Sequence, residues 1–162
     1  MKKALLVLFA VAATLTANAS SVKWGMVSGN TISEITSGTA YLIIGSVPEA
    51  SSLQKESFSV SDFGGEVFKT GTFASGTYLS TAESITSPVA TYNVFMAVIS
   101  ADGKTAAVAN ATKSLRIAAA ATPVNLQWTT ANFNIYTAVP EPCSVALVLL
   151  GVAALGLKRK IA

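Results

Sequence analysis

The segment Thr91–Ser100 (TYNVFMAVIS), followed by Asp102-Gly103 and Lys104–Ala109 (KTAAVA), decides the fold class of this chain. Within it, Val94–Ile99 is apolar at every position, which is the pattern of a central strand covered on both faces. Asp102-Gly103 between two strand-like segments is a strong signal for a β-hairpin with a type I′ turn. We therefore predict two adjacent antiparallel strands within a β-sheet.

Further strands are predicted on both sides of this hairpin. Ala40–Ile44 is a second run that is apolar on both faces, and Pro48–Lys55 is expected to form a short helix with Pro48 in its first turn. The spacing predicts about seven to nine short strands in a small antiparallel β-sandwich, and hence an all-β domain over residues 20–138. Alternating apolar residues mark the other strands, and glycine-containing pairs mark turns: Val22, Trp24 and Met26; Phe58 and Val60; Leu115 and Ile117; Val124, Leu126 and Trp128; and the pairs Gly29-Asn30, Gly64-Gly65 and Ser75-Gly76.

Serine and threonine supply most of the polar surface of this domain, because 32 of them lie between Ser20 and Val139, where charged residues are few. Threonine is favoured in strands and serine in turns, so the composition agrees with a β-fold. A disordered spacer is the alternative, but Trp24, Tyr41 and Phe95 lie inside apolar runs, which such segments lack. The domain contains no cysteine, so no internal disulfide is expected to stabilise it.

The N-terminal 19 residues have the organisation of a signal peptide. Lys2 and Lys3 precede the apolar run Ala4–Leu15, and Ala17-Asn18-Ala19 is a small-x-small cleavage box. We expect signal peptidase to cleave after Ala19, so that the mature chain begins near Ser20. The alternative of an uncleaved anchor is weakened by the short apolar run and the well-placed box.

The C-terminal residues 139–162 are predicted to be a second targeting segment. Val139-Pro140-Glu141-Pro142 precedes an uncharged run of 15 residues, Cys143–Leu157, and then the basic cluster Lys158-Arg159-Lys160. The prolines stop any preceding strand, and an all-apolar helix of roughly 22 Å suits lipid, although a hydrocarbon core is about 30 Å thick. The basic cluster should stay cytoplasmic and leave the domain outside. A permanent tail anchor with a chance Pro-Glu-Pro is the alternative.

Val139 to Lys160 resembles the PEP-CTERM sorting signal of exported proteins of Gram-negative bacteria, in which a Val-Pro-Glu-Pro motif precedes a membrane-spanning stretch and a basic cluster. This resemblance implies processing by a membrane enzyme, exosortase, and an association with exopolysaccharide. Cys143 departs from the family, whose members often carry Ser, Ala or Gly directly after the motif. We interpret Cys143 as a small apolar residue at the membrane interface; a role in processing or acylation is the alternative.

The charge balance argues against a nucleic-acid partner. Five of the eleven basic residues lie in the two targeting segments, and between Ser20 and Val139 six basic residues face seven acidic ones, which leaves −1. A chain without a basic patch lacks the electrostatic basis for binding phosphates.

The residue types exclude most catalytic chemistry. The chain has no histidine, and its one cysteine, Cys143, lies in the sorting segment, so that Ser-His, Cys-His and ordinary zinc sites are unavailable. We predict no enzyme activity, no cofactor and no metal. Asp62 and Glu66 around Gly64-Gly65 lack the ligand density of a calcium loop, and Asn110 lies in a sequon that we regard as chance. The seven carboxylates of the domain are interpreted as solvated surface charges: Glu34, Glu49, Glu56, Asp62, Glu66, Glu83 and Asp102.

The sequence thus predicts an exported structural or interaction protein of the cell envelope or extracellular matrix. A secreted carbohydrate-binding module is the alternative, and it would need two or more exposed aromatic residues on one face or groove. A small hydrolase would need two carboxylates about 5 to 10 Å apart in a cleft. Trp24 and Trp128 are interpreted as core residues because they alternate with polar neighbours. The exposure of these tryptophans and of Tyr78, Tyr92 and Tyr136 separates the possibilities.

Overall fold

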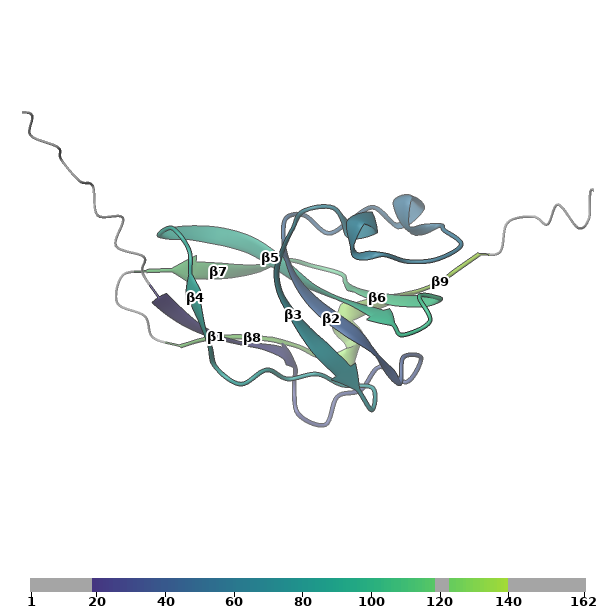
Figure 1. Ribbon diagram of the computed structural model, residues 1–162, viewed down its shortest axis with the longest axis horizontal. Helices are drawn as coiled ribbons and strands as arrows, with labels where there is room; N and C mark the ends of the chain where they lie inside the picture. The colour runs from purple at the N-terminus through teal and green to yellow at the C-terminus, as the bar shows by residue number, and fades with distance from the viewer. Residues whose placement is uncertain (1–18, 119–122, 140–162) are drawn as a thin grey trace, which may run out of the picture.

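Nine strands and three short 3-10 helices make up the computed structural model, which describes residues 19–118 and 123–139 (Figure 1). The predicted all-β fold class is confirmed. The strands are β1 (Ala19–Met26), β2 (Ser37–Ile44), β3 (Glu66–Ala74), β4 (Glu83–Thr86), β5 (Ala90–Ser100), β6 (Thr105–Ala109), β7 (Lys113–Ile117), β8 (Val124–Trp128) and β9 (Phe133–Thr137). The 3-10 helices are η1 (Ala50–Leu53), η2 (Val60–Phe63) and η3 (Thr130–Asn132).

The strands form two sheets. The larger sheet is antiparallel and has the order β3-β2-β5-β6-β9, with β7 also paired to β5. The smaller sheet has the order β4-β1-β8, and its β1–β8 pair is parallel, with Val22 opposite Val124 and Met26 opposite Trp128. The prediction of a purely antiparallel fold is therefore wrong at this pair, because β8 enters the small sheet from β7 of the large sheet and not through a hairpin with β1.

Strand β5 is the centre of the large sheet, as its sequence predicts. All six side chains of Val94–Ile99 are buried. One edge of β5 pairs with β2, and the other pairs with β7 near its start and with β6 near its end. The β2–β3 connection adds Leu53, Phe58 and Phe63 to the same apolar core, which also contains Trp24 and Trp128 of the small sheet. Within the described part of the chain, the strand pairings and the core residues lie between Ala19 and Val139, so residues 20–139 keep all of them except the pairing of Ala19 with Thr86.

The hairpin between β5 and β6 is confirmed, but its turn is not type I′. That turn requires a positive φ at both central residues, whereas only Gly103 has one (67°). The Gly103 N–H donates to the Ser100 carbonyl oxygen (2.9 Å), and the Thr105 N–H donates to Ser100 Oγ (2.9 Å). Asp102 Oδ1 accepts from Ser100 Oγ (2.6 Å) and from the Lys104 N–H (2.9 Å). These side-chain bonds stabilise a longer loop in place of the two-residue turn.

Two further local predictions are wrong in the β2–β3 connection. The helix expected over Pro48–Lys55 is only the single 3-10 turn η1, where Ser52 Oγ donates to the Glu49 carbonyl oxygen (2.7 Å). The strand expected at Phe58 and Val60 is absent from the described residues. Phe58 is a buried loop residue, and Val60 begins η2 because Ser59 and Asp62 form a capping box around its first turn.

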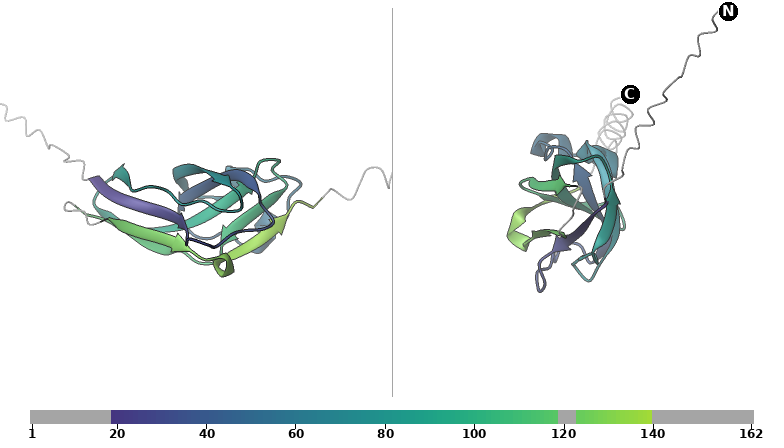
Figure 2. Two further views of the ribbon diagram at one scale, coloured as in Figure 1. Left: turned by 90° about the horizontal axis from the view of Figure 1, so that it is seen from below. Right: turned by 90° about the vertical axis from the view of Figure 1, so that its left-hand side faces the viewer.

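The two ends of the described chain lie at opposite ends of the long axis. Strand β1 starts at one end, and β9 leads to Val139 at the other (Figures 1 and 2). Beyond β9, the Ala138 N–H donates to the Lys104 carbonyl oxygen and the Val139 N–H donates to the Lys55 carbonyl oxygen, both at 2.8 Å. The domain therefore holds the chain through Val139.

Candidate functional site

Only two of the residues predicted for targeting belong to the described part of the chain. Ala19 is the first residue of β1, and its backbone pairs with Thr86 of β4. Val139 is 55% exposed, although its N–H is bonded to Lys55. The other predicted targeting residues lie outside the described residues: Ala17, Pro140, Glu141, Pro142, Cys143, Lys158, Arg159 and Lys160. The signal peptide, the sorting motif and the apolar helix over Cys143–Leu157 thus stay predictions.

The corner at which the described chain ends, at Val139, is built by the β2–β3 connection and the β5–β6 hairpin. Lys55 and Lys104 accept the last two backbone bonds of the chain through their carbonyl oxygens. The Lys104 ammonium donates to the Glu56 carbonyl oxygen (3.0 Å), which joins the hairpin to the connection. Val139, the first residue of the predicted motif, is thereby fixed to the domain without a spacer.

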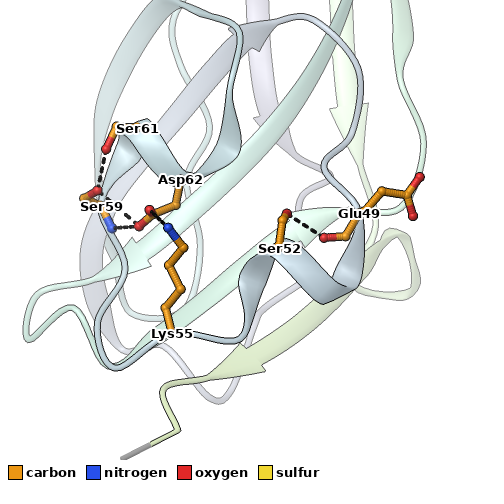
Figure 3. Close-up of polar contacts among 6 residues, drawn as sticks. All are labelled: Glu49, Ser52, Lys55, Ser59, Ser61 and Asp62. Carbon is orange, nitrogen blue, oxygen red and sulfur yellow. Dashed lines mark hydrogen bonds and ion pairs between the residues drawn. The ribbon is translucent and has the colours of Figure 1, made fainter. Parts of the chain in front are cut away.

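A polar network orders the connection next to this corner (Figure 3). The Lys55 ammonium contacts Asp62 Oδ1 (2.5 Å), and Asp62 Oδ2 accepts from the Ser59 N–H (2.7 Å) and Ser59 Oγ (3.1 Å). Burial acts to raise the pKa of Asp62, but the hydrogen bonds from Lys55 and Ser59 outweigh it and lower the pKa below its ordinary value. Both carboxylate oxygens are thus hydrogen-bonded inside the loop, and within the described residues no group of three or more potential metal ligands is found.

The other carboxylates behave largely as surface charges. Five of the seven are exposed, and the remaining two, Asp62 and Glu83, are half-buried and paired with lysines. Lys69 Nζ lies 3.4 Å from Glu83 Oε2. The interpretation of these acids as surface charges is therefore confirmed for most of them, with the two lysine pairs as the exceptions.

The tryptophans are core residues, as their alternation predicts. Trp24 is 0% and Trp128 1% exposed, so neither ring can stack on a ligand at the surface. The Trp24 ring packs against Tyr78 with 4.6 Å between centroids, and Lys113 Nζ lies 5.5 Å from the Trp128 ring centroid. Both indole N–H groups are buried and have no hydrogen-bond partner within the described part of the chain. The tyrosines that the sequence singled out, Tyr78, Tyr92 and Tyr136, are half-buried.

A groove of about 480 Å³ opens where β2 ends, between β3, β4 and the start of β5. It is lined by Phe68 and Tyr92, whose rings stack with 6.4 Å between centroids and 28° between planes. Sequence reasoning had considered Tyr92 but missed Phe68. Leu42 pairs with Lys69 and Ile43 pairs with Val67, so the β2–β3 register shifts and leaves Phe68 unpaired. The sequence carries little signal for Phe68, because this shift depends on how the two strands pair.

Comparison with protein-family models, with curated proteins and with solved structures found no match for this chain. Across residues 19–118 and 123–139, no helix is long and apolar enough to cross a membrane.

Proposed function

We propose that this chain is an exported, non-catalytic protein of the cell envelope or extracellular matrix, whose β-sandwich domain is the cargo of a C-terminal sorting signal. The order of motif, apolar run and basic cluster at residues 139–160 carries the proposal. The signal peptide over residues 1–19 supports export independently, because it rests on different residues.

The position of the domain between these segments also supports the proposal. Strand β1 begins at Ala19, at the predicted cleavage box, and the domain's backbone bonds extend to Val139, the first residue of the motif. The buried core residues of the described chain run from Val22 to Phe133, so none of them would be removed with either segment. Signal peptidase would act at the end where β1 starts, and an exosortase-like enzyme at the opposite end beside Lys55 and Lys104.

Intact-mass analysis of the chain recovered from the envelope and medium of its native host tests this function. We expect loss of residues 1–19 and processing within the tail, and any attached glycan would appear as added mass. As a matched control, the variant with Pro140, Glu141 and Pro142 replaced by alanine should keep its tail. A tail retained in the wild type would show a permanent anchor instead, and a full-length chain found soluble in the cytoplasm would overturn the proposal.

A secreted carbohydrate-binding module is the second candidate, and one observation favours it. The buried tryptophans cannot serve as stacking platforms, but the Phe68–Tyr92 pair lines an open groove. In that case exopolysaccharide, which the resemblance of the tail implies as a partner, would be bound by the domain itself.

A further inference from the structure

The groove beside Phe68 and Tyr92 exists because two strands are irregular at the same place. Strand β2 ends at Ile44, which pairs with Val94 of β5. The first residues of β5, before Val94, therefore have no β2 residue beside them. On β3, Phe68 is the extra residue of a β-bulge. A bulge changes the direction in which the side chain of such a residue points. Its ring lies beside Tyr92 at the space that β2 leaves open.

One ring of the aromatic pair is anchored by a hydrogen bond. Tyr92 Oη donates to the Pro88 carbonyl oxygen (3.1 Å), which fixes the tyrosine ring against the β4–β5 connection. Both rings are only half-buried and both line the groove. A partly exposed, ordered pair of aromatic rings offers apolar faces at a small entropic cost, and binding sites use such faces for flat ligands with apolar patches.

Polar groups surround the rings. The Lys69–Glu83 pair joins β3 to β4 across the side of the groove, and the lining includes Glu66 and Ser84. One lysine and one glutamate line the groove, so its lining carries no net charge and does not attract phosphates or other anions. The Lys69–Glu83 pair ties the edge of β3 to β4 of the other sheet at this point, so the groove is poorly suited to an added peptide strand. Carboxylates, an ammonium and hydroxyls are donors and acceptors for a ligand rich in hydroxyl groups.

We infer that this groove binds a neutral oligosaccharide. One sugar ring packs its C–H face against the exposed aromatic surface of Phe68 and Tyr92, while its hydroxyls donate to Glu66 and accept from Lys69. The volume of about 480 Å³ lies within the range of roughly 300 to 1,000 Å³ that is usual for small-ligand sites. The inference concerns the domain alone, so its failure would leave the proposed sorting and export untouched.

The test is a titration of ¹⁵N-labelled residues 20–139, followed by amide chemical shifts, with cellohexaose, laminarihexaose, xylohexaose and chitohexaose as neutral probes. We expect at least one probe to shift the amides of residues 66–69 and 84–92 in a saturable manner. Phe68→Ala and Tyr92→Ala should each weaken that binding about tenfold or more, whereas Tyr92→Phe, which keeps the ring, should weaken it much less. Tyr136→Ala is the matched control, because Tyr136 is an equally half-buried tyrosine on β9, at the other edge of the large sheet.

Dispersed spectra confirm that each variant is folded before its binding is compared. The inference is overturned if none of the four probes shifts these amides, or if Phe68→Ala and Tyr92→Ala bind as the wild type does. Tighter binding of oligogalacturonate than of every neutral probe would contradict the neutral class of ligand.

Discussion

Replacing Trp128 by alanine should destabilise the domain strongly while leaving its surface unchanged. Trp128 is 1% exposed at the end of β8, where it lies opposite Met26 of β1, so the substitution removes a large side chain from the apolar core. Truncations of buried tryptophan or phenylalanine to alanine cost about 3 to 5 kcal/mol. The lost indole N–H has no hydrogen-bond partner among residues 19–118 and 123–139, and burying such a group costs about 1 to 3 kcal/mol, so its removal offsets part of the loss. We therefore expect about 3 kcal/mol, at the lower end of the range.

A loss of this size is readily measured on residues 20–139. Domains of this length have free energies of unfolding of about 5 to 15 kcal/mol, so the variant should still fold, with a Tm lowered by about 12 °C at roughly 4 °C per kcal/mol. Urea denaturation followed by circular dichroism and by the fluorescence of Trp24 gives the free energy of unfolding. Trp128→Phe, which keeps an aromatic ring and removes the unpaired N–H, should lose less than half as much.

Asn125→Ala is the control on the same strand, because Asn125 is exposed and should change stability by no more than about 0.5 kcal/mol. If Trp128→Ala denatures at the same urea concentration as the wild type, the ring does not belong to a packed core. In that event the assignment of both tryptophans to the interior is wrong. Trp128 would then be a candidate residue for stacking against a sugar ring.

Three further outcomes are expected from other parts of the chain. Asp62→Asn should cost about 1 kcal/mol at pH 7, since the Lys55 contact is partly exposed. Because the folded-state pKa of Asp62 is lowered, this stabilisation is present above the ordinary pKa of about 3.9 and is lost as the pH falls through the folded value. Thermal unfolding of wild type and variant should therefore converge as the pH falls below about 4, and a constant difference would contradict the pairing. Gly38→Ala should cost more than about 2 kcal/mol in thermal unfolding, because its new methyl group would overlap the Ile99 carbonyl of the adjacent strand. Its control is Gly29→Ala, which has open space and a φ of 82° and should cost only about 1 kcal/mol. Equal losses would refute the close approach of β2 and β5. Replacing Lys158, Arg159 and Lys160 by serine removes charges that each cost about 2.5 to 3.5 kcal/mol at mid-membrane, so membrane fractionation and intact mass should show slippage or secretion without processing; unchanged anchoring would show the cluster to be incidental.

The strands could be predicted where the signal is local. Alternation at Val124, Leu126 and Trp128 and the apolar run Val94–Ile99 depend only on neighbours in the sequence, and both give the observed strands. The parallel partnership of β1 and β8 could not be predicted in this way. Because both strands bury alternate residues, periodicity fits parallel and antiparallel pairing equally well. The direction of β8 relative to β1 depends on how the chain passes from the large sheet, which contains β7, to the small sheet.

The turn and the groove were missed for a related reason. Asp102-Gly103 usually indicates a type I′ turn, but the side chain of Ser100 takes hydrogen bonds that the backbone would otherwise make, and a residue outside the pair thus changes the turn. The bulge at Phe68 carries no glycine to mark it. Its partner Tyr92 comes from a strand that is not even adjacent to β3 in the sheet. Only the three-dimensional arrangement brings these two rings together.

The same arrangement separates the proposed ligand site from the proposed anchor. Val139 is held beside Lys104, at the end of β5 that enters the hairpin, whereas Tyr92 lies near the beginning of β5. Eight residues of strand separate Tyr92 from Ser100, which corresponds to about 26 Å at roughly 3.3 Å per residue. If the proposed tail tethers the domain through Val139, the hairpin corner lies nearer to the tether than the groove does. The proposed sugar site and the proposed processing site then use different ends of β5, so that a change at one end leaves the residues of the other in place.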